Sequence, residues 1–134
     1  MEANYAMRCT MKIAEVSKRY GISADTLRYY ERIGILRDVP RNPSGLRDYS
    51  EKNCNAVEFV KCMRNAGMSI ESLKLYMDLF YEGDHTKGQR KSLLEAQRDV
   101  IRDRISSLEE AFARLNYKIE HYDEVASMER ELMA

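Results

Sequence analysis

The apolar positions near the N-terminus fall into two short helical blocks separated by a glycine. Ile13, Val16 and Tyr20 recur at i, i+3 and i+7, so they share one face of a helix. Gly21 ends that helix, because glycine readily takes the left-handed conformation that closes many helices. Leu27 marks the buried side of the second block. Two short helices joined by a glycine turn are the outline of a helix-turn-helix motif.

The next segment predicts a small hairpin. Residues 35–39 and 46–48 would form its strands, and both prolines of the chain lie between them. Asn42, Pro43 and Gly45 stand at positions i, i+1 and i+3 of a type I turn. The hairpin would carry three arginines: Arg37, Arg41 and Arg47.

Serine caps predict two further helices. The third would run from Ser50 to about Ala66, and the fourth from Ser69 to a break at Gly83. Apolar side chains at helical spacing give each helix a buried row. The rows are Val57, Val60 and Met63 in the third helix, and Ile70, Leu73, Met77 and Phe80 in the fourth.

A long fifth helix is predicted from about Lys87 to the C-terminus, with apolar residues in alternating steps of three and four. This spacing is typical of a coiled coil. From Leu94 to Tyr122 the helix would be about 43 Å long, which exceeds what a core of this size can cover. A partner helix is therefore favoured over packing on its own domain. The predicted dimer interface is Leu94, Ile101, Ile105, Leu108, Phe112, Leu115, Ile119 and Tyr122.

Composition narrows the class of protein. The 134 residues contain no apolar run long enough to span a membrane. Residues 1–10 show no signal peptide and are expected to be a flexible leader. Three cysteines at irregular spacing argue against a disulfide framework and favour a reducing cytoplasm.

The net charge of zero conceals an asymmetry between the two halves. Residues 1–66 carry 12 Lys and Arg against 8 Asp and Glu, whereas residues 67–134 carry 10 against 14. A basic front half suggests an anionic partner for that half only.

Arginine and tyrosine side chains make double-stranded DNA the expected partner. Arg28, Tyr29 and Arg32 lie on the free side of the second helix, and Arg47 and Tyr49 lie on the hairpin. Taken singly, each suits an ordinary solvated surface. Together they supply donors for phosphate, and arginine can also pair with guanine in the major groove. A basic helix beside an arginine-bearing hairpin predicts a winged helix-turn-helix.

Several motifs resemble the MerR family of transcriptional regulators in combination. They are Ile13-Ala14-Glu15-Val16, Gly21-Ile22-Ser23, Thr26-Leu27-Arg28-Tyr29-Tyr30-Glu31, Gly34-Ile35-Leu36 and Gly45-Leu46-Arg47-Asp48-Tyr49. The resemblance covers Met11 to about Phe80. It implies a mainly α fold with a winged helix-turn-helix DNA-binding domain over residues 11–83. A long C-terminal dimerisation helix over residues 84–134 would then form an antiparallel coiled coil.

The resemblance also implies how the protein works. A homodimer would bind a near-palindromic promoter, distort it and untwist it for RNA polymerase when an effector arrives. Arg28, Tyr29 and Tyr30 of the second helix and Arg47 and Tyr49 of the hairpin would contact DNA. Four further candidates for phosphate contacts are Ser23, Thr26, Lys61 and Arg64.

The class of effector is limited by the absence of the metal ligands and the ligand-binding domain found in some relatives. Metal-sensing relatives hold their ion with cysteines near the coiled coil, whereas no cysteine follows Cys62 and the two histidines, His85 and His121, are isolated. No metal site and no cofactor are therefore expected. A large C-terminal ligand domain, as in multidrug-sensing relatives, is not expected either.

Cys54 is the remaining candidate for the switch. It would lie about one turn into the helix that Ser50 caps, where the helix N-terminus favours a thiolate. Residues 47–59 resemble the aldehyde- and nitrosothiol-responsive subfamily, which implies a sensor thiol modified by an aldehyde or another electrophile. The alternative is an inert core cysteine, the fate expected for Cys62. Cys9 lies in the leader.

Other functions stay open beside this one. The chain could be a MerR-like regulator with a non-covalent effector or none, a thiol enzyme using Cys54, or a coiled-coil interaction module. An enzyme would need a base next to its nucleophile, and no histidine is placed to serve. A cytoplasmic regulator that is not an enzyme is the expected class.

Overall fold

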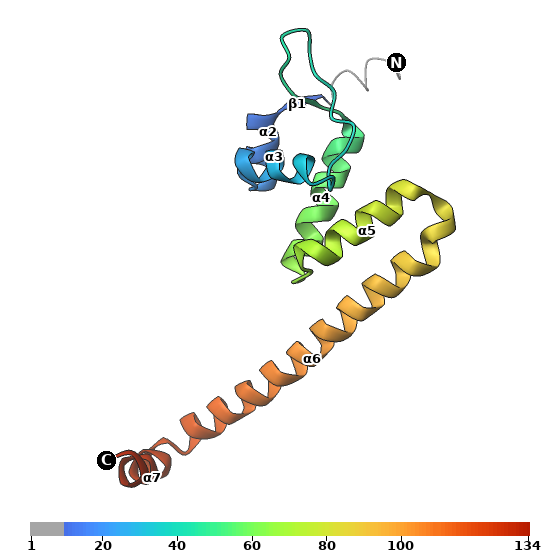
Figure 1. The fold of residues 1–134 in the computed structure, drawn as a ribbon. Coiled ribbons are helices and arrows are strands. Elements are labelled where there is room, and N and C mark those ends of the chain that lie inside the picture. Colours follow the sequence, from blue (N-terminus) through green and yellow to red (C-terminus); the bar gives the residue numbers. More distant parts are fainter. Residues whose placement is uncertain (1–9) are drawn as a thin grey trace, which may run out of the picture. The chain divides into compact units, whose positions relative to one another are not determined.

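The computed structural model describes residues 10–134 and is mainly helical (Figure 1). The leader that was expected over residues 1–10, and Cys9 with it, lies outside the described residues except for Thr10. The elements are β1 (Met11–Lys12), α2 (Ile13–Tyr20), α3 (Ala24–Arg32), β2 (Asp48–Tyr49), α4 (Glu51–Asn65), α5 (Ile70–Glu82), the short 3-10 helix η1 (Asp84–Thr86), α6 (Lys87–Glu120) and α7 (Tyr122–Met133).

The chain divides into two compact units, the first ending at Gln97 and the second beginning at Arg98. The first unit therefore extends beyond residue 83, where the DNA-binding domain was expected to end. Two contacts show why. Leu94 packs against the core of this unit, and the Gln97 side chain donates to the carbonyl of Ala66 at 2.8 Å.

The helix-turn-helix forms as the sequence predicts. Gly21 closes α2 with a φ of 66°, and its N–H donates to the carbonyl of Ser17. Ser23 then caps α3, its hydroxyl accepting from the backbone N–H of Thr26 at 3.1 Å. One residue thus ends the first helix and another starts the second, which fixes the short turn between them.

The sheet differs from the expected hairpin. β2 pairs in antiparallel fashion with β1, in the register Met11 to Tyr49 and Lys12 to Asp48. The first expected strand, residues 35–39, is not a strand, because Ile35 and Leu36 turn inward and are buried directly after α3. What remains of the hairpin is an antiparallel bridge between Arg41 and Arg47. We call residues 40–48 the wing.

Side-chain caps also start α4 and α5, as predicted. At α4 the Ser50 hydroxyl accepts from the N–H of Asn53, and the Asn53 side chain accepts from the N–H of Ser50, which forms a capping box. Asn53 is itself buried and donates to the carbonyls of Arg37 and Asp38. Ser69 caps α5 by accepting from the N–H of Ser72. The start of α4 is therefore tied to the chain that leaves α3.

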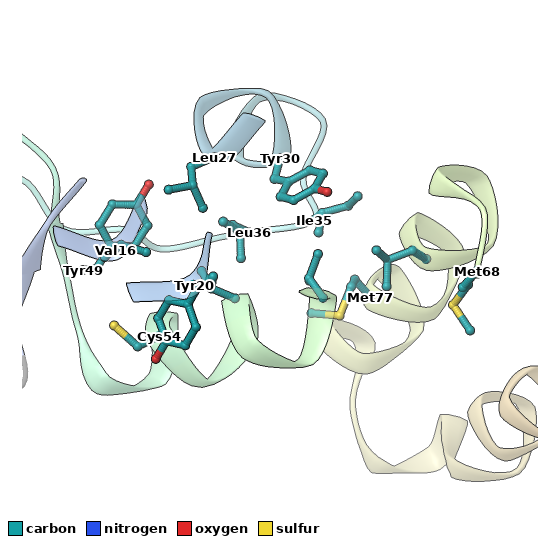
Figure 2. Packing of buried hydrophobic residues seen from close by; sticks show 13 residues of the cluster. Val16, Tyr20, Leu27, Tyr30, Ile35, Leu36, Tyr49, Cys54, Met68 and Met77 are labelled. Carbon is teal, nitrogen blue, oxygen red and sulfur yellow. The ribbon is translucent and has the colours of Figure 1, made fainter. Parts of the chain in front are cut away.

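The core of the first unit joins its helices and the segment after α3 (Figure 2). Val16 and Leu27 from the helix-turn-helix and Val57 from α4 are fully buried, as their spacing predicted. Phe80 is an exception to the predicted rows, since half of its surface is exposed. The whole buried set is Val16, Tyr20, Leu27, Tyr30, Ile35, Leu36, Tyr49, Cys54, Val57, Val60, Met68, Leu73 and Met77.

The long C-terminal helix is interrupted, which the sequence pattern did not predict. α6 ends at Glu120, His121 leaves helical geometry with φ −113° and ψ 35°, and α7 follows. Lys118 and Glu129 form an ion pair at 2.6 Å across the break. The expected single helix to the C-terminus is thus two helices joined at His121. In the described part of the chain, no helix is long and apolar enough to cross a membrane.

Candidate nucleic-acid interface

Helix α3, the second helix of the helix-turn-helix and therefore the expected recognition helix, separates its side chains by face. Leu27 and Tyr30 are buried, and Arg28 and Arg32 are exposed. Arg28 reaches back to Asp25 at 2.9 Å, and both side chains are open to solvent. The Arg32 guanidinium lies 5.5 Å from the centre of the Tyr29 ring, within cation–π range. The outer face of α3 therefore offers two guanidiniums and a tyrosine to a ligand.

Ser23 and Thr26 lie at the start of the same helix. Their hydroxyls are 2.8 Å apart, and the Ser23 hydroxyl donates to that of Thr26. Ser23 also accepts the capping bond, so its side chain is already used by the fold. Two hydroxyls at a helix N-terminus can still contact a phosphate, because the remaining backbone N–H groups point the same way.

The wing is closed by a turn with the predicted residues. The N–H of Gly45 donates to the carbonyl of Asn42 at 2.8 Å, as in a type I turn. The Asn42 side chain accepts from the N–H groups of Ser44 and Leu46. Gly45 has a φ of 80°, which glycine takes without strain. The wing projects from the helices as a narrow loop (Figure 1).

The wing arginines converge on one carboxylate of the recognition helix. The Nε of Arg47 donates to Glu31 at 2.6 Å, and a terminal nitrogen of Arg41 donates to its other oxygen at 3.2 Å. Glu31 is largely enclosed, with 19% of its side chain exposed. We call Glu31, Arg41 and Arg47 the wing clamp. Sequence reasoning missed Glu31 because it lies sixteen residues from Arg47 and only the fold brings them together.

The third arginine of this segment, Arg37, faces α5 instead. It pairs with Asp78 and donates to the carbonyl of Gly34. Its guanidinium also lies 4.4 Å from the centre of the Tyr81 ring. The Tyr81 hydroxyl donates to the carbonyl of Ile35, and burial raises the pKa of this tyrosine. Arg37 therefore fastens the chain after α3 to α5.

Two tyrosines expected to contact DNA lie inward. Tyr30 is buried, and Tyr49 is fully buried beneath the wing. The Tyr49 hydroxyl has no hydrogen-bond partner among residues 10–134, and burial raises its pKa. Tyr49 has no exposed surface with which to reach a phosphate or a base, and Tyr30 is only 7% exposed. Of the expected set, these two belong to the packing that supports the interface.

Lys61 and Arg64 lie on α4, apart from the wing clamp. A terminal nitrogen of Arg64 donates to the carbonyl of Met68 at 2.6 Å and so braces the turn between α4 and α5. Arg64 is exposed and Lys61 is partly exposed, and neither shows an ion pair in the described residues. Both keep N–H donors that a phosphate could accept.

Neither Cys54 nor Cys62 forms a disulfide within the described part of the chain, and one of the two is not where the sequence predicted. Cys54 is buried in the first turns of α4, whereas Cys62, expected to be a core residue, is exposed. The reason is that Cys62 turns away from the row formed by Val57 and Val60. Cys54 is the fourth residue of its helix, as predicted.

Tyr20 is the neighbour of Cys54 that the sequence did not reveal. Figure 2 shows the hydroxyl of Tyr20 beside the Cys54 side chain. Burial raises the Tyr20 pKa, and a hydrogen bond with Cys54 acts in the same direction. A bond that holds the phenol proton in place is one in which the phenol donates to sulfur.

A cavity of about 630 Å³ opens between α4, α5 and the segment after α3. Four aromatic side chains line it, together with two cations at Arg37 and Lys52. The aromatic residues are Phe59, Tyr76, Phe80 and Tyr81. Cys54 does not line this cavity, although its neighbours Asn53 and Asn55 do.

The apolar seam of the second unit lies open to solvent. Ile101 is partly exposed, and the next six seam positions are each more than half exposed: Ile105, Leu108, Phe112, Leu115, Ile119 and Tyr122. Leu94 was predicted to belong to this seam, but it packs on the core of the first unit instead. An exposed apolar stripe of this length is a typical association surface.

Comparisons with known proteins agree with this geometry. A family model described as MerR HTH family regulatory protein matches residues 11–79, and one described as MerR, DNA binding matches residues 55–117. The HTH-type transcriptional regulator AdhR of Bacillus subtilis is 52% identical over 91 residues. That match covers 68% of this chain and 65% of AdhR, so the chain matches less than two thirds of the AdhR length.

Two crystal structures show the same fold. A MerR family transcriptional regulator from Listeria monocytogenes superposes with a TM-score of 0.78 at 43% identity, covering 91% of this chain and 93% of the other. HiNmlR, a MerR family regulator lacking the sensor domain and bound to promoter DNA, gives a TM-score of 0.75 at 31% identity. The superposition covers 88% of this chain and 94% of HiNmlR.

The families and relatives matched are transcriptional regulators and not enzymes. The resemblance found in the sequence is confirmed, as is the winged helix-turn-helix followed by a long helix. The chain belongs to the MerR family and is a DNA-binding transcriptional regulator.

Proposed function

We propose that this regulator binds a near-palindromic promoter as a homodimer, with α3 in the major groove and the wing on the adjacent backbone. The observation that carries the proposal is the outer face of α3, where Arg28, Tyr29 and Arg32 lie next to a wing held by Glu31. The DNA-bound state of HiNmlR supports it. Such a protein acts in the cytoplasm, where promoter DNA is found.

The exposed seam of the second unit supplies the dimer interface. Two copies that bury Leu108 and Leu115 against one another would satisfy the apolar stripe. An antiparallel pairing, as the family resemblance implies, gives two recognition helices related by two-fold symmetry. They would read half-sites about 34 Å apart and distort the promoter for RNA polymerase.

Substitution of single arginines tests the DNA contacts. Arg28→Ala should cost on the order of 1–3 kcal/mol of binding and relax sequence preference at one position, because this exposed side chain can exchange its ion pair with Asp25 for a base edge. Arg47→Ala should weaken binding to every sequence and reduce the salt dependence, because it removes a phosphate contact. Titration of labelled duplexes checks both, and equal sequence-independent losses would remove the base-reading role from Arg28.

We propose Cys54 as the residue through which the regulator is switched. Addition of the thiol to an aldehyde forms an S–C bond, breaks the C=O π bond and transfers the thiol proton to the carbonyl oxygen, which gives a hemithioacetal. Cys54 lies in the first turns of α4, and the Tyr20 hydroxyl is its neighbour and hydrogen-bond partner. An adduct in this buried site needs more room than the thiol, so α4 would shift against α2.

Serine substitution separates the two cysteines. Cys54→Ser should keep the fold and operator affinity but abolish induction of a reporter by an aldehyde, since a hydroxyl is far less nucleophilic than a thiolate. Cys62→Ser is the matched control and should respond normally. Intact-mass spectrometry of the treated protein should show one adduct that depends on Cys54. Full induction in the Cys54→Ser strain would end the thiol hypothesis.

The aromatic cavity favours one second candidate, a non-covalent effector. Its volume and apolar lining are in the range of small-molecule sites. Tyr76→Ala would enlarge the cavity and remove a ring that stacks on Phe59 at 5.0 Å. Loss of induction in Tyr76→Ala, with induction intact in Cys54→Ser, would favour this candidate over the thiol.

A further inference from the structure

The wing is a weak structural element taken by itself. Its two sides meet at the bridge between Arg41 and Arg47, which two backbone hydrogen bonds flank, from Asp48 to Pro40 and from Asn42 to Leu46. Short isolated hairpins are only marginally stable in water. In addition, the two bridged residues are both cations, and like charges directly opposite one another are destabilising.

Glu31 compensates for both weaknesses. Its two oxygens each accept from one arginine, so the carboxylate joins the two sides of the wing to each other and to α3. Glu31 is the least exposed of the three side chains. The exposed fraction is 43% for Arg41, 25% for Arg47 and 19% for Glu31. Charge-assisted hydrogen bonds in a partly enclosed site are stronger than exposed ones.

The clamp leaves both arginines able to bind DNA. Each guanidinium has five N–H donors, and the contacts with Glu31 use the Nε of Arg47 and one terminal nitrogen of Arg41. The remaining donors can bind a phosphate without breaking the clamp. The three groups together carry a net charge of +1, half of what the two arginines would carry alone.

We propose that Glu31 is a positioning residue for DNA recognition. It fixes the wing arginines at a set distance from the recognition helix, so that α3 and the wing bind the duplex as one surface. It also lowers the attraction of the wing for DNA of any sequence. The proposal rests on DNA binding through α3 and the wing, as set out above.

Removing the Glu31 charge should change specific and non-specific binding in opposite directions. Glu31→Gln should weaken operator binding on the order of tenfold, because the wing is no longer held. The same change should strengthen binding to a scrambled duplex and steepen its salt dependence by about one phosphate contact, because one more positive charge is available. A purely structural role would weaken both, and a purely electrostatic role would strengthen both.

The experiment measures fluorescence anisotropy of operator and scrambled duplexes with the full chain, between 50 and 200 mM salt, the range over which phosphate contacts are resolved. Glu15→Gln is the matched control, since Glu15 is exposed on α2 and the substitution changes the charge equally. Glu31→Asp keeps the charge with a shorter reach, so it should lose operator affinity without gaining affinity for the scrambled duplex. Thermal unfolding of each variant reports on the fold.

Three outcomes would overturn the proposal. Glu31→Gln could strengthen binding to both duplexes no differently from the control Glu15→Gln. It could weaken both while lowering the unfolding temperature, or it could leave the ratio between them unchanged. A wild-type protein that does not prefer the operator would instead overturn the DNA-reading role of α3 and the wing, and the clamp with it.

Discussion

At the scale of one residue, Tyr49 supports the DNA-binding surface from beneath and is not itself part of that surface. Its ring fills the space beneath the wing, and its hydroxyl is left without a partner in the described residues. Burial raises its pKa, Arg47 opposes that rise, and Glu31 adds to it. The ring therefore stabilises the wing by packing, whereas the hydroxyl contributes an unsatisfied polar group.

Tyr49→Phe should keep operator affinity and raise the free energy of unfolding by about 1 kcal/mol, since a buried unpaired polar group is removed. The effect should grow at alkaline pH. Above the usual tyrosine pKa of 10.0 the unfolded chain ionises while the folded residue stays neutral, so wild-type stability falls as pH rises through the folded pKa. Phenylalanine removes this part of the loss.

Urea unfolding at pH 8 and at pH 10.5 checks both statements about Tyr49, with Tyr29→Phe as the control on the outer face of α3. Tyr20 and Tyr81, whose pKa values are also raised by burial, should preserve part of the alkaline loss. A large decrease in operator affinity for Tyr49→Phe would restore a DNA contact to this hydroxyl.

At the scale of elements, the helix starts were predictable and the long-range pairs were not. Each helix start depends on a serine whose hydroxyl accepts from the backbone N–H three residues later, so the local sequence is enough to predict it. These serines are Ser23, Ser50 and Ser69. The β1–β2 pairing, the wing clamp and the contact of Tyr20 with Cys54 each join distant segments, and no local pattern encodes them. The break at His121 involves neither glycine nor proline, the residues by which such breaks are usually recognised.

The start of α4 should be less tolerant of change at Asn53 than at Ser50. Ser50→Ala removes a cap and should cost about 1 kcal/mol. Asn53→Ala removes the other half of the capping box and also the hydrogen bonds from its side chain to the carbonyls of Arg37 and Asp38, which adds about 0.5–1.5 kcal/mol.

Equilibrium unfolding of the single and double variants checks the α4 cap. Ser50→Ala and Asn53→Ala should cost less together than the sum of their separate costs, because they share hydrogen bonds. Ser69→Ala at the start of α5 is the control and should add to Asn53→Ala in full. Additive losses for the first pair would mean that the capping box does not act as a unit.

At the scale of the whole molecule, charge and hydrophobicity are distributed between different parts of the chain. The arginines of the interface lie in the first unit, and the exposed apolar stripe lies in the second. This division was visible in the sequence, since residues 1–66 are basic and the seven-residue repeat begins later. Sequence reasoning included Leu94 in the stripe because the repeat continues through it, although the fold buries that residue elsewhere.

Leu108→Glu should produce a monomer that binds the operator poorly, because a charge in the apolar seam opposes association and one half-site offers few contacts. The helical content of the monomer should change little, since Leu108 is exposed in a single chain. Light scattering and circular dichroism test these expectations. The control is Glu109→Gln, beside the seam, and an intact dimer after Leu108→Glu would move the interface elsewhere.

The wing clamp also bears on how such a sequence can change over time. Two arginines that share one carboxylate are not independent sites. Loss of Glu31 leaves two cations opposite each other, and loss of one arginine leaves Glu31 with a single cation to pair with. Positions 31, 41 and 47 should therefore vary jointly among relatives, with an acid at 31 accompanying bases at 41 and 47. Where position 31 is neutral, at least one of the other two should have lost its charge.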